Sequence, residues 1–140
     1  MRRTLLLVAA AGLLLAAVPA TASGASSARP PLRGTNWVLT DRASIGVPLG
    51  DVAVNAVFAA GHVSGTSGCN GFSASFETSG TDRITIGPIA STLRGCDSSD
   101  QEQQYFAALD LAKTYQVTGN QLTLFRDGGT IAVTATRAPK

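Results

Sequence analysis

The only imidazole of the chain is His62, and it decides whether histidine-dependent hydrolysis is open to this sequence. A Ser-His-Asp or Cys-His set needs an imidazole that takes up and returns a proton near neutral pH. His62 follows Gly61 at the end of a predicted strand, which favours an exposed turn residue over a catalytic base. The run Gly65-Thr66-Ser67-Gly68-Cys69 ends in cysteine where a G-x-S-x-G nucleophile elbow requires glycine. We therefore expect no catalytic residue and no enzyme activity.

Metal and cofactor sites have equally little support in the residue types and their spacing. A structural zinc site uses about four Cys or His ligands, and the chain has two cysteines and one histidine. Asp97, Asp100 and Glu102 lie close together but lack the glycine-broken alternation of a calcium loop, so we interpret them as helix-capping residues. No C-x-x-C, no phosphate-binding glycine loop and no distinctive carboxylate pair is present. We expect neither a metal nor a cofactor.

Residues 1–22 have the organisation of a signal peptide. Arg2 and Arg3 precede an apolar run from Leu5 to Val18, and Ala20-Thr21-Ala22 has the small-x-small form of a cleavage site. The apolar run is shorter than the roughly 20 residues of a membrane-spanning helix. No cysteine stands at the cleavage site to carry a lipid. We therefore predict cleavage after Ala22 and a secreted or cell-envelope protein without a membrane span, with the general secretory and twin-arginine routes both open.

Removal of the signal peptide changes the charge balance of the protein. Arg2 and Arg3 account for the formal net charge of +2, so the mature chain has equal numbers of basic and acidic residues. No basic run of the kind that binds nucleic acid remains. Residues 23–31 are small, polar and end in proline, which predicts a flexible leader before a single domain over residues 32–138. We expect a protein or small-molecule partner of unknown identity, and no nucleic acid.

The two cysteines, Cys69 and Cys96, are the only ones in the chain. Export places them in an oxidising compartment, where one disulfide is the expected state and two separate reduced thiols are the alternative. The chain-entropy model gives such a bond about 3 to 4 kcal/mol of stabilisation. We predict that this bond fixes the entrance of a helix to a glycine-bounded loop.

Short runs of β-branched and aromatic residues, separated by glycine, predict a mainly β fold. In the second run Val52, Val54, Ala56 and Phe58 share one face by the strand period of two, while Asn55 faces the other way. Gly119-Asn120 and Asp127-Gly128-Gly129 predict turns of a C-terminal three-stranded meander. The predicted strands are Asn36 to Thr40, Val52 to Ala59, Phe72 to Glu77, Arg83 to Ile86, Tyr115 to Thr118, Gln121 to Arg126 and Thr130 to Thr136.

One segment, Ser98 to Lys113, has the pattern of an amphipathic helix. It contains no glycine or proline, and its apolar residues recur at the helical spacing. Ser99 followed by Glu102 fits a capping box, and Lys113 suits the negative end of the helix dipole. The stripe that we expect to face the sheet consists of Tyr105, Ala108, Leu109 and Ala112.

Several strings of the sequence together resemble the META domain of the HslJ type. They are Gly34-Thr35-Asn36-Trp37-Val38-Leu39, Phe58, Val63-Ser64-Gly65, Gly68-Cys69-Asn70-Gly71-Phe72, Ile84-Thr85-Ile86-Gly87, Ser91-Thr92 with Cys96, Glu102, Tyr105-Phe106, Leu109, Tyr115 and Leu122-Thr123-Leu124. The likeness extends from about Leu32 to Val133, with Arg94-Gly95 where the family pattern has Met-Ala. It implies a compact antiparallel sheet of about seven to eight strands, curled toward a barrel, with one α-helix packed on it. It also implies an envelope or secreted location and, for members studied in bacteria, a link to heat shock and antibiotic tolerance, with no assigned reaction.

Two residues within these strings have both a structural and a binding interpretation. Asn70, between Cys69 and Gly71, is interpreted as a turn residue whose amide bonds its own backbone, or as part of a rigid polar binding loop with Gly71. Trp37 is interpreted as a core residue, with a surface binding role as the alternative. Taken together, the sequence predicts an exported, non-enzymatic stress-response protein that acts by binding. The alternatives are a carrier of a small apolar ligand inside the curled sheet and an uncharacterised hydrolase.

Overall fold

The computed structural model describes residues 31–40, 53–97 and 99–139. The predicted signal peptide, almost all of the predicted leader, Val52 and Ser98 lie outside these described residues. Within them no helix has the length and apolar character needed to cross a lipid bilayer.

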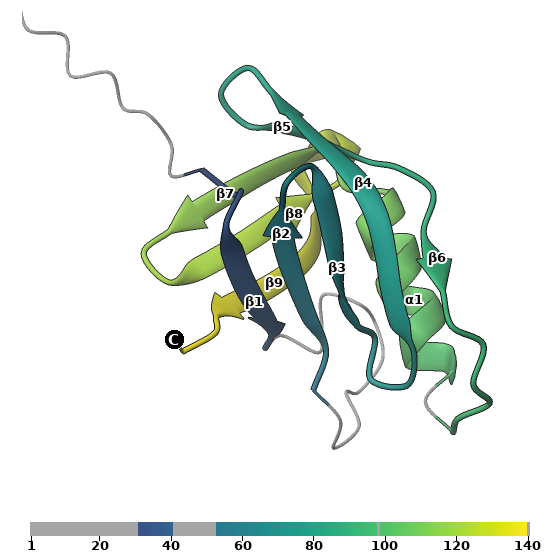
Figure 1. Cartoon of the computed structure of the whole chain (residues 1–140). Helices are drawn as coiled ribbons and strands as arrows, with labels where there is room; N and C mark the ends of the chain where they lie inside the picture. The colour runs from purple at the N-terminus through teal and green to yellow at the C-terminus, as the bar shows by residue number, and fades with distance from the viewer. Residues whose placement is uncertain (1–30, 41–52, 98, 140) are drawn as a thin grey trace, which may run out of the picture.

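The described residues form a mainly β structure with one helix (Figure 1). The strands are β1 (Thr35–Leu39), β2 (Asn55–Ala59), β3 (His62–Thr66), β4 (Gly71–Ser79), β5 (Arg83–Ile86), β6 (Ala90–Ser91), β7 (Thr114–Thr118), β8 (Gln121–Phe125) and β9 (Ile131–Arg137). The helix α1 (Ser99–Asp110) lies between β6 and β7 in the sequence. The predicted fold class is confirmed.

All strand pairs are antiparallel, and their order returns on itself. The sheet order is β3-β2-β1-β9-β8-β7-β5-β4-β6, and β3 also pairs with β4. Eight strands therefore form a ring, and β6 extends the far side of β4. The shortest strand pairing in the ring is between β5 and β7, where only Arg83 and Thr114 stand in register. The sheet is thus curled and nearly closed around its core, as the resemblance to the META domain implies.

The core fills the inside of the curled sheet. Trp37 is fully buried, which confirms its interpretation as a core residue, and its indole Nε1 donates to Thr35 Oγ1 at 2.6 Å. The guanidinium of Arg137, on the neighbouring strand β9, lies 4.5 Å from the centre of the indole ring. Phe58 and Phe76 meet edge to face inside the sheet, with ring centres 5.0 Å apart. Aromatic and branched side chains thus occupy the interior in which an apolar ligand would have to bind.

The helix α1 lies behind β4 and β6 in Figure 1 and packs its predicted stripe against the sheet. Tyr105, Ala108 and Leu109 are buried, as is Ala112 just beyond the helix. The ring of Tyr105 meets that of Phe72 on β4 with centres 5.7 Å apart. The predicted C-terminal boundary is wrong, because the helix ends at Asp110.

Lys113 therefore does not cap α1, and the physical reason is its place in the sheet. Its backbone N–H donates to the carbonyl of Phe125 at 2.8 Å, and its carbonyl accepts from the N–H of Ile84 at 3.0 Å. These bonds join the segment before β7 to both β8 and β5. Pairing of Lys113 with β5 and β8 thus determines the backbone conformation at Lys113, and the helix ends before this residue.

The strand β3 was not predicted, and His62 is its first residue rather than a turn residue. Only Val63 is buried in this strand, so the sequence shows no clear alternation of apolar and polar residues. The turn before it consists of Ala60 and Gly61, both with positive φ, of 48° and 82°. Such angles are those of a two-residue hairpin turn that suits asparagine or glycine better than alanine. His62 is nevertheless exposed, as expected.

The predicted C-terminal meander is confirmed. Gly119 and Asn120 connect β7 to β8, and Thr118 pairs with Gln121 across this turn. A 3-10 turn over Asp127–Gly129 connects β8 to β9, with an irregularity of register between Leu124 and Phe125. The two predicted glycine turns therefore lie where the sequence places them.

Candidate functional site

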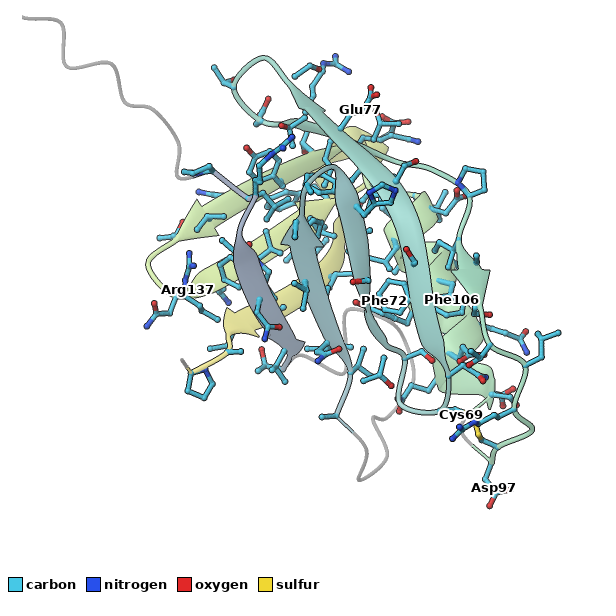
Figure 2. The ribbon with its side chains drawn as sticks, in the orientation of Figure 1. Cys69, Phe72, Glu77, Asp97, Phe106 and Arg137 are labelled. Atoms are coloured by element: carbon cyan, nitrogen blue, oxygen red, sulfur yellow. A yellow bond between two sulfur atoms is a disulfide. The ribbon has the colours of Figure 1, made fainter. Side chains whose placement is uncertain are left out.

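The disulfide between Cys69 and Cys96 is present, with Cα atoms 6.1 Å apart. This distance lies within the usual range of about 4.4 to 6.8 Å for disulfides. Cys69 belongs to the turn between β3 and β4, and Cys96 precedes α1 by three residues. The bond therefore joins the sheet to the helix entrance, as predicted, and Figure 2 shows it at one end of the molecule beside Asp97.

Asn70 connects three segments through its side-chain amide. The Oδ1 atom accepts from Thr92 Oγ1 at 2.8 Å and from the backbone N–H of Arg94 at 2.7 Å. The Nδ2 group donates to the carbonyl of Arg94 at 3.2 Å and to Glu102 Oε1 at 3.0 Å. An amide has two donors and one acceptor oxygen with two lone pairs, so these bonds use its full capacity. Asn70 is buried, and its side chain binds the fold itself rather than only its own turn.

Glu102 is the counterpart of Asn70 on α1. Its second oxygen, Oε2, accepts a hydrogen bond from the hydroxyl of Ser67. The same hydroxyl accepts from the backbone N–H of Asn70 at 3.2 Å. Both carboxylate oxygens are therefore engaged with the turn before β4, which the interpretation of Glu102 as a helix-capping residue did not include. We call the set of Ser67, Asn70, Thr92, Glu102 and the disulfide the junction.

Gln101 adds a further bond between α1 and the same turn. It is buried, and its Nε2 donates to the carbonyl of Ser67 at 3.1 Å. Gly68 has a φ of 102°, a backbone conformation that glycine adopts readily and other residues rarely adopt. A side chain at Gly68 would also meet the amide of Gln101. The turn is thus held from the helix side by polar contacts and by close packing.

The junction does not assemble a hydrolytic set. Ser67 is fully buried and its hydroxyl is bonded to Glu102. His62 is the first residue of β3, and Ser67 directly follows the last residue of this strand. Five residues of extended strand therefore separate His62 from Ser67 by roughly 16 Å. In the described part of the chain no three His, Cys, Asp or Glu side chains gather as a metal site would require. The hydrogen bonds and the disulfide of the junction instead hold the turn before β4 in one conformation.

The surface next to the junction is a shallow groove with an open volume of about 490 Å³. It crosses the outer face of β3, β4 and β6, and its only large lining residue, Phe72, is itself buried. Gly71, predicted as part of a binding loop, lies in the groove, whereas the Asn70 side chain lies beneath it in the junction. We call this surface the groove; its lining residues are Ser64, Gly65, Gly71, Phe72, Ser73, Ala90, Ser91 and Thr92.

Gly65, which lines the groove, is packed against the neighbouring strand β2. A Cβ atom at this position would overlap with the backbone carbonyl oxygen of Asn55 on β2. The side chain of Asn55 in turn accepts from the N–H of Thr66 at 2.8 Å. Close approach of β2 and β3 therefore requires glycine at this position.

Sequence reasoning missed Ser67, Thr92 and Glu102 as members of the junction, and all of the groove except Gly71. Ser67 and Glu102 are 35 residues apart, and Asn70 and Thr92 are 22 apart. No local pattern connects residues at such distances. The available signal was the pair of cysteines, since both lie within a few residues of these partners.

The described structure defines a class of protein: a curled, nearly closed antiparallel sheet with one helix tied to it by a disulfide. The chain belongs to the META domain family, whose sequence profile matches residues 30–138. The match confirms the resemblance seen in the sequence and extends slightly beyond it at both ends. No curated protein matches the chain.

Solved structures share this fold. A protein from Burkholderia xenovorans, determined by NMR, is 25% identical, with a TM-score of 0.63 over 78% of this chain and 85% of that one. A DUF4847-family protein from Bacteroides vulgatus, determined by crystallography, is 17% identical, with a TM-score of 0.58 over 78% of this chain and 96% of that one. The second likeness concerns the fold alone.

Proposed function

We propose that this protein is an exported, non-enzymatic member of the META family that acts by binding a partner in the groove. The observation that carries the proposal is the junction, which uses a disulfide and a fully bonded Asn70 amide to fix the turn bordering the groove. Fixing a surface before binding lowers the entropic cost of association. A bare, small-residue surface beside such a junction suits a partner that contacts the backbone and small side chains.

Export to the cell envelope or the medium is part of the proposal. The organisation of residues 1–22 supports it, and so does a disulfide, which persists in oxidising compartments. Family membership adds the expectation of a role in the response to heat or other stress. Intact mass and N-terminal sequencing of the protein from the culture medium or envelope would give Ser23 as the first residue. Recovery of only the uncleaved chain in the cytoplasm would refute export.

Binding is tested with a variant that fills the groove. Ser73 is exposed on β4 and lines the groove, so Ser73→Arg places a long charged side chain across it. Gln116 is exposed on β7 outside the groove, so Gln116→Arg is the matched control. Affinity capture from the native envelope or medium, with quantitative mass spectrometry, should recover one partner with the wild type and Gln116→Arg but not with Ser73→Arg. Equal recovery with all three would contradict the proposal.

The two alternative functions receive less support from the geometry. A carrier needs room inside the curled sheet, and that interior is occupied by the side chains of Trp37, Phe58 and Phe76 among others. A hydrolase needs an accessible nucleophile near a base, and Ser67 is buried away from His62. Neither alternative has an observation of its own in its favour.

A further inference from the structure

A second hollow, remote from the junction, lies where β4 extends beyond the end of its neighbouring strand β3. The register of β3 with β4 ends at His62 and Ser75, followed by one bond from the N–H of Phe76 to the carbonyl of Gly61 at 2.8 Å. From Glu77 onward β4 pairs only with β5. Figure 1 shows the β4–β5 hairpin projecting beyond the β2–β3 turn, and Figure 2 shows Glu77 on the projecting part. One backbone edge of β4 is therefore open here.

The register also determines which backbone groups lie on this open edge. The carbonyl of Ser75 accepts from the N–H of Gly87, so the backbone groups of Ser75 and Glu77 face β5 and its continuation. Backbone groups alternate between the two edges of a strand. The N–H and C=O of Thr78 consequently face away from β5, on the side where β3 has already ended. Among the described residues they have no strand to pair with.

The hollow beside this edge has a volume of about 400 Å³ and is lined by Arg33, Gly61, Ser75, Phe76, Glu77 and Thr78. Arg33 is exposed just before β1, and its guanidinium makes no hydrogen bond or ion pair with another described residue. A guanidinium presents two parallel N–H donors that match a carboxylate. A free cation and a free strand edge thus meet in one concave site, whose size falls within the usual range for ligand pockets.

We propose that this hollow binds the C-terminal end of an extended peptide. The terminal carboxylate lies on the guanidinium of Arg33, and the last peptide unit continues the sheet by bonding to the backbone N–H and C=O of Thr78. This combines strand addition at an open edge with capture of a chain terminus, both recurrent modes of peptide recognition. Glu77 adds a negative charge to the lining, which disfavours acidic side chains near the peptide terminus. The site is separate from the groove and goes beyond the function proposed above.

The experiment is an NMR titration of the ¹⁵N-labelled protein with N-acetylated tripeptides. Ala-Ala-Ala, Ala-Lys-Ala and Ala-Leu-Ala are each used with a free carboxylate and with a terminal amide. We expect saturable shifts of the Thr78 and Gly61 amide resonances with at least one free acid, and about tenfold or more weaker binding of its amide. No saturable shift with any free acid, or equal affinity for acid and amide, would overturn the proposal.

Three variants make the assignment specific. Arg33→Gln should weaken binding of the free acid by about tenfold or more, whereas Arg94→Gln, which removes an exposed guanidinium beside the disulfide, should leave it unchanged. Thr78→Pro removes one N–H that makes no bond in the sheet, so it should weaken both forms of the peptide while the fold is kept. Ser73→Arg in the groove should have no effect, which separates this site from the groove. An unchanged affinity in Arg33→Gln would contradict the site.

Discussion

The side-chain amide of Asn70 donates to Glu102 Oε1 at 3.0 Å, joining the turn before β4 to the helix across 32 residues of sequence. The Cys69–Cys96 bond joins the same turn to the segment that leads into the helix. A covalent and a polar connection therefore act in parallel, next to the groove. Because each connection restrains the same pair of elements, their contributions to stability are expected to be coupled.

Asn70→Ala should lower the free energy of unfolding by about 2 to 4 kcal/mol, since it removes the four hydrogen bonds that the buried Asn70 amide makes with Thr92, Arg94 and Glu102. Urea denaturation of the oxidised protein measures this change. Asn36 is exposed on β1, so Asn36→Ala is the control, with a change within about 0.5 kcal/mol. Equal stability of the two variants would show that the amide network contributes nothing.

Replacement of both cysteines, as Cys69→Ser with Cys96→Ser, should cost about 2 to 5 kcal/mol. The change acts mainly through the unfolded chain, which becomes less restrained. Thermal unfolding should therefore shift to lower temperature, and treatment of the wild type with a reductant should produce a similar shift. A double variant as stable as the oxidised wild type would contradict this role of the bond.

Ala60→Asn should stabilise the protein by about 0.5 to 1 kcal/mol. Ala60 has a φ of 48°, a conformation that alanine adopts at a cost and asparagine more readily. The neighbouring Ala59→Gly is the matched control of opposite sign, because glycine within the exposed end of β2 weakens a strand. Chemical denaturation of both variants gives the comparison. A loss of stability in Ala60→Asn would show that the β2–β3 turn differs from this geometry.

Burial of the Tyr105 phenol should make the folded protein less stable at alkaline pH. Burial raises the pKa of the Tyr105 phenol above its ordinary value, so the folded state holds this proton at a pH where the unfolded state releases it. The associated stability is complete below the unfolded pKa near 10 and falls by about 1.4 kcal/mol per pH unit above it. Tyr105→Phe should remove this part of the pH dependence. Parallel denaturation curves of both proteins between pH 9 and pH 11 test it, and identical slopes would contradict it.

Much of the fold follows from local sequence patterns, and the exceptions have physical causes. The stripe of Tyr105, Ala108 and Leu109 and the turn at Gly119-Asn120 are visible because they depend on neighbours in sequence. The strand β3 escapes prediction because it buries only Val63 and is defined by pairing on both sides. Helix length was overestimated because closure of the ring at Lys113 overrides helical propensity.

The candidate site shows the same division. The cysteines indicate where the turn and the helix entrance meet, since one pairing exists for two cysteines. The bonding of Glu102 to Ser67 depends on tertiary packing, so a local motif suggests capping instead. The groove is a property of three strands at once, and only its border at Gly71 is visible in the sequence.

The central claim, that the groove is the binding surface, is tested most directly by photo-crosslinking in the producing cells. A benzoylphenylalanine residue is introduced at Ser73 in the groove or at Gln116 outside it, and the cells are irradiated with and without heat stress. Binding in the groove predicts one discrete crosslinked product from position 73, lost when Ser64→Arg fills the groove, and none from position 116. Equal products from both positions, or none from position 73 under either condition, would contradict the claim.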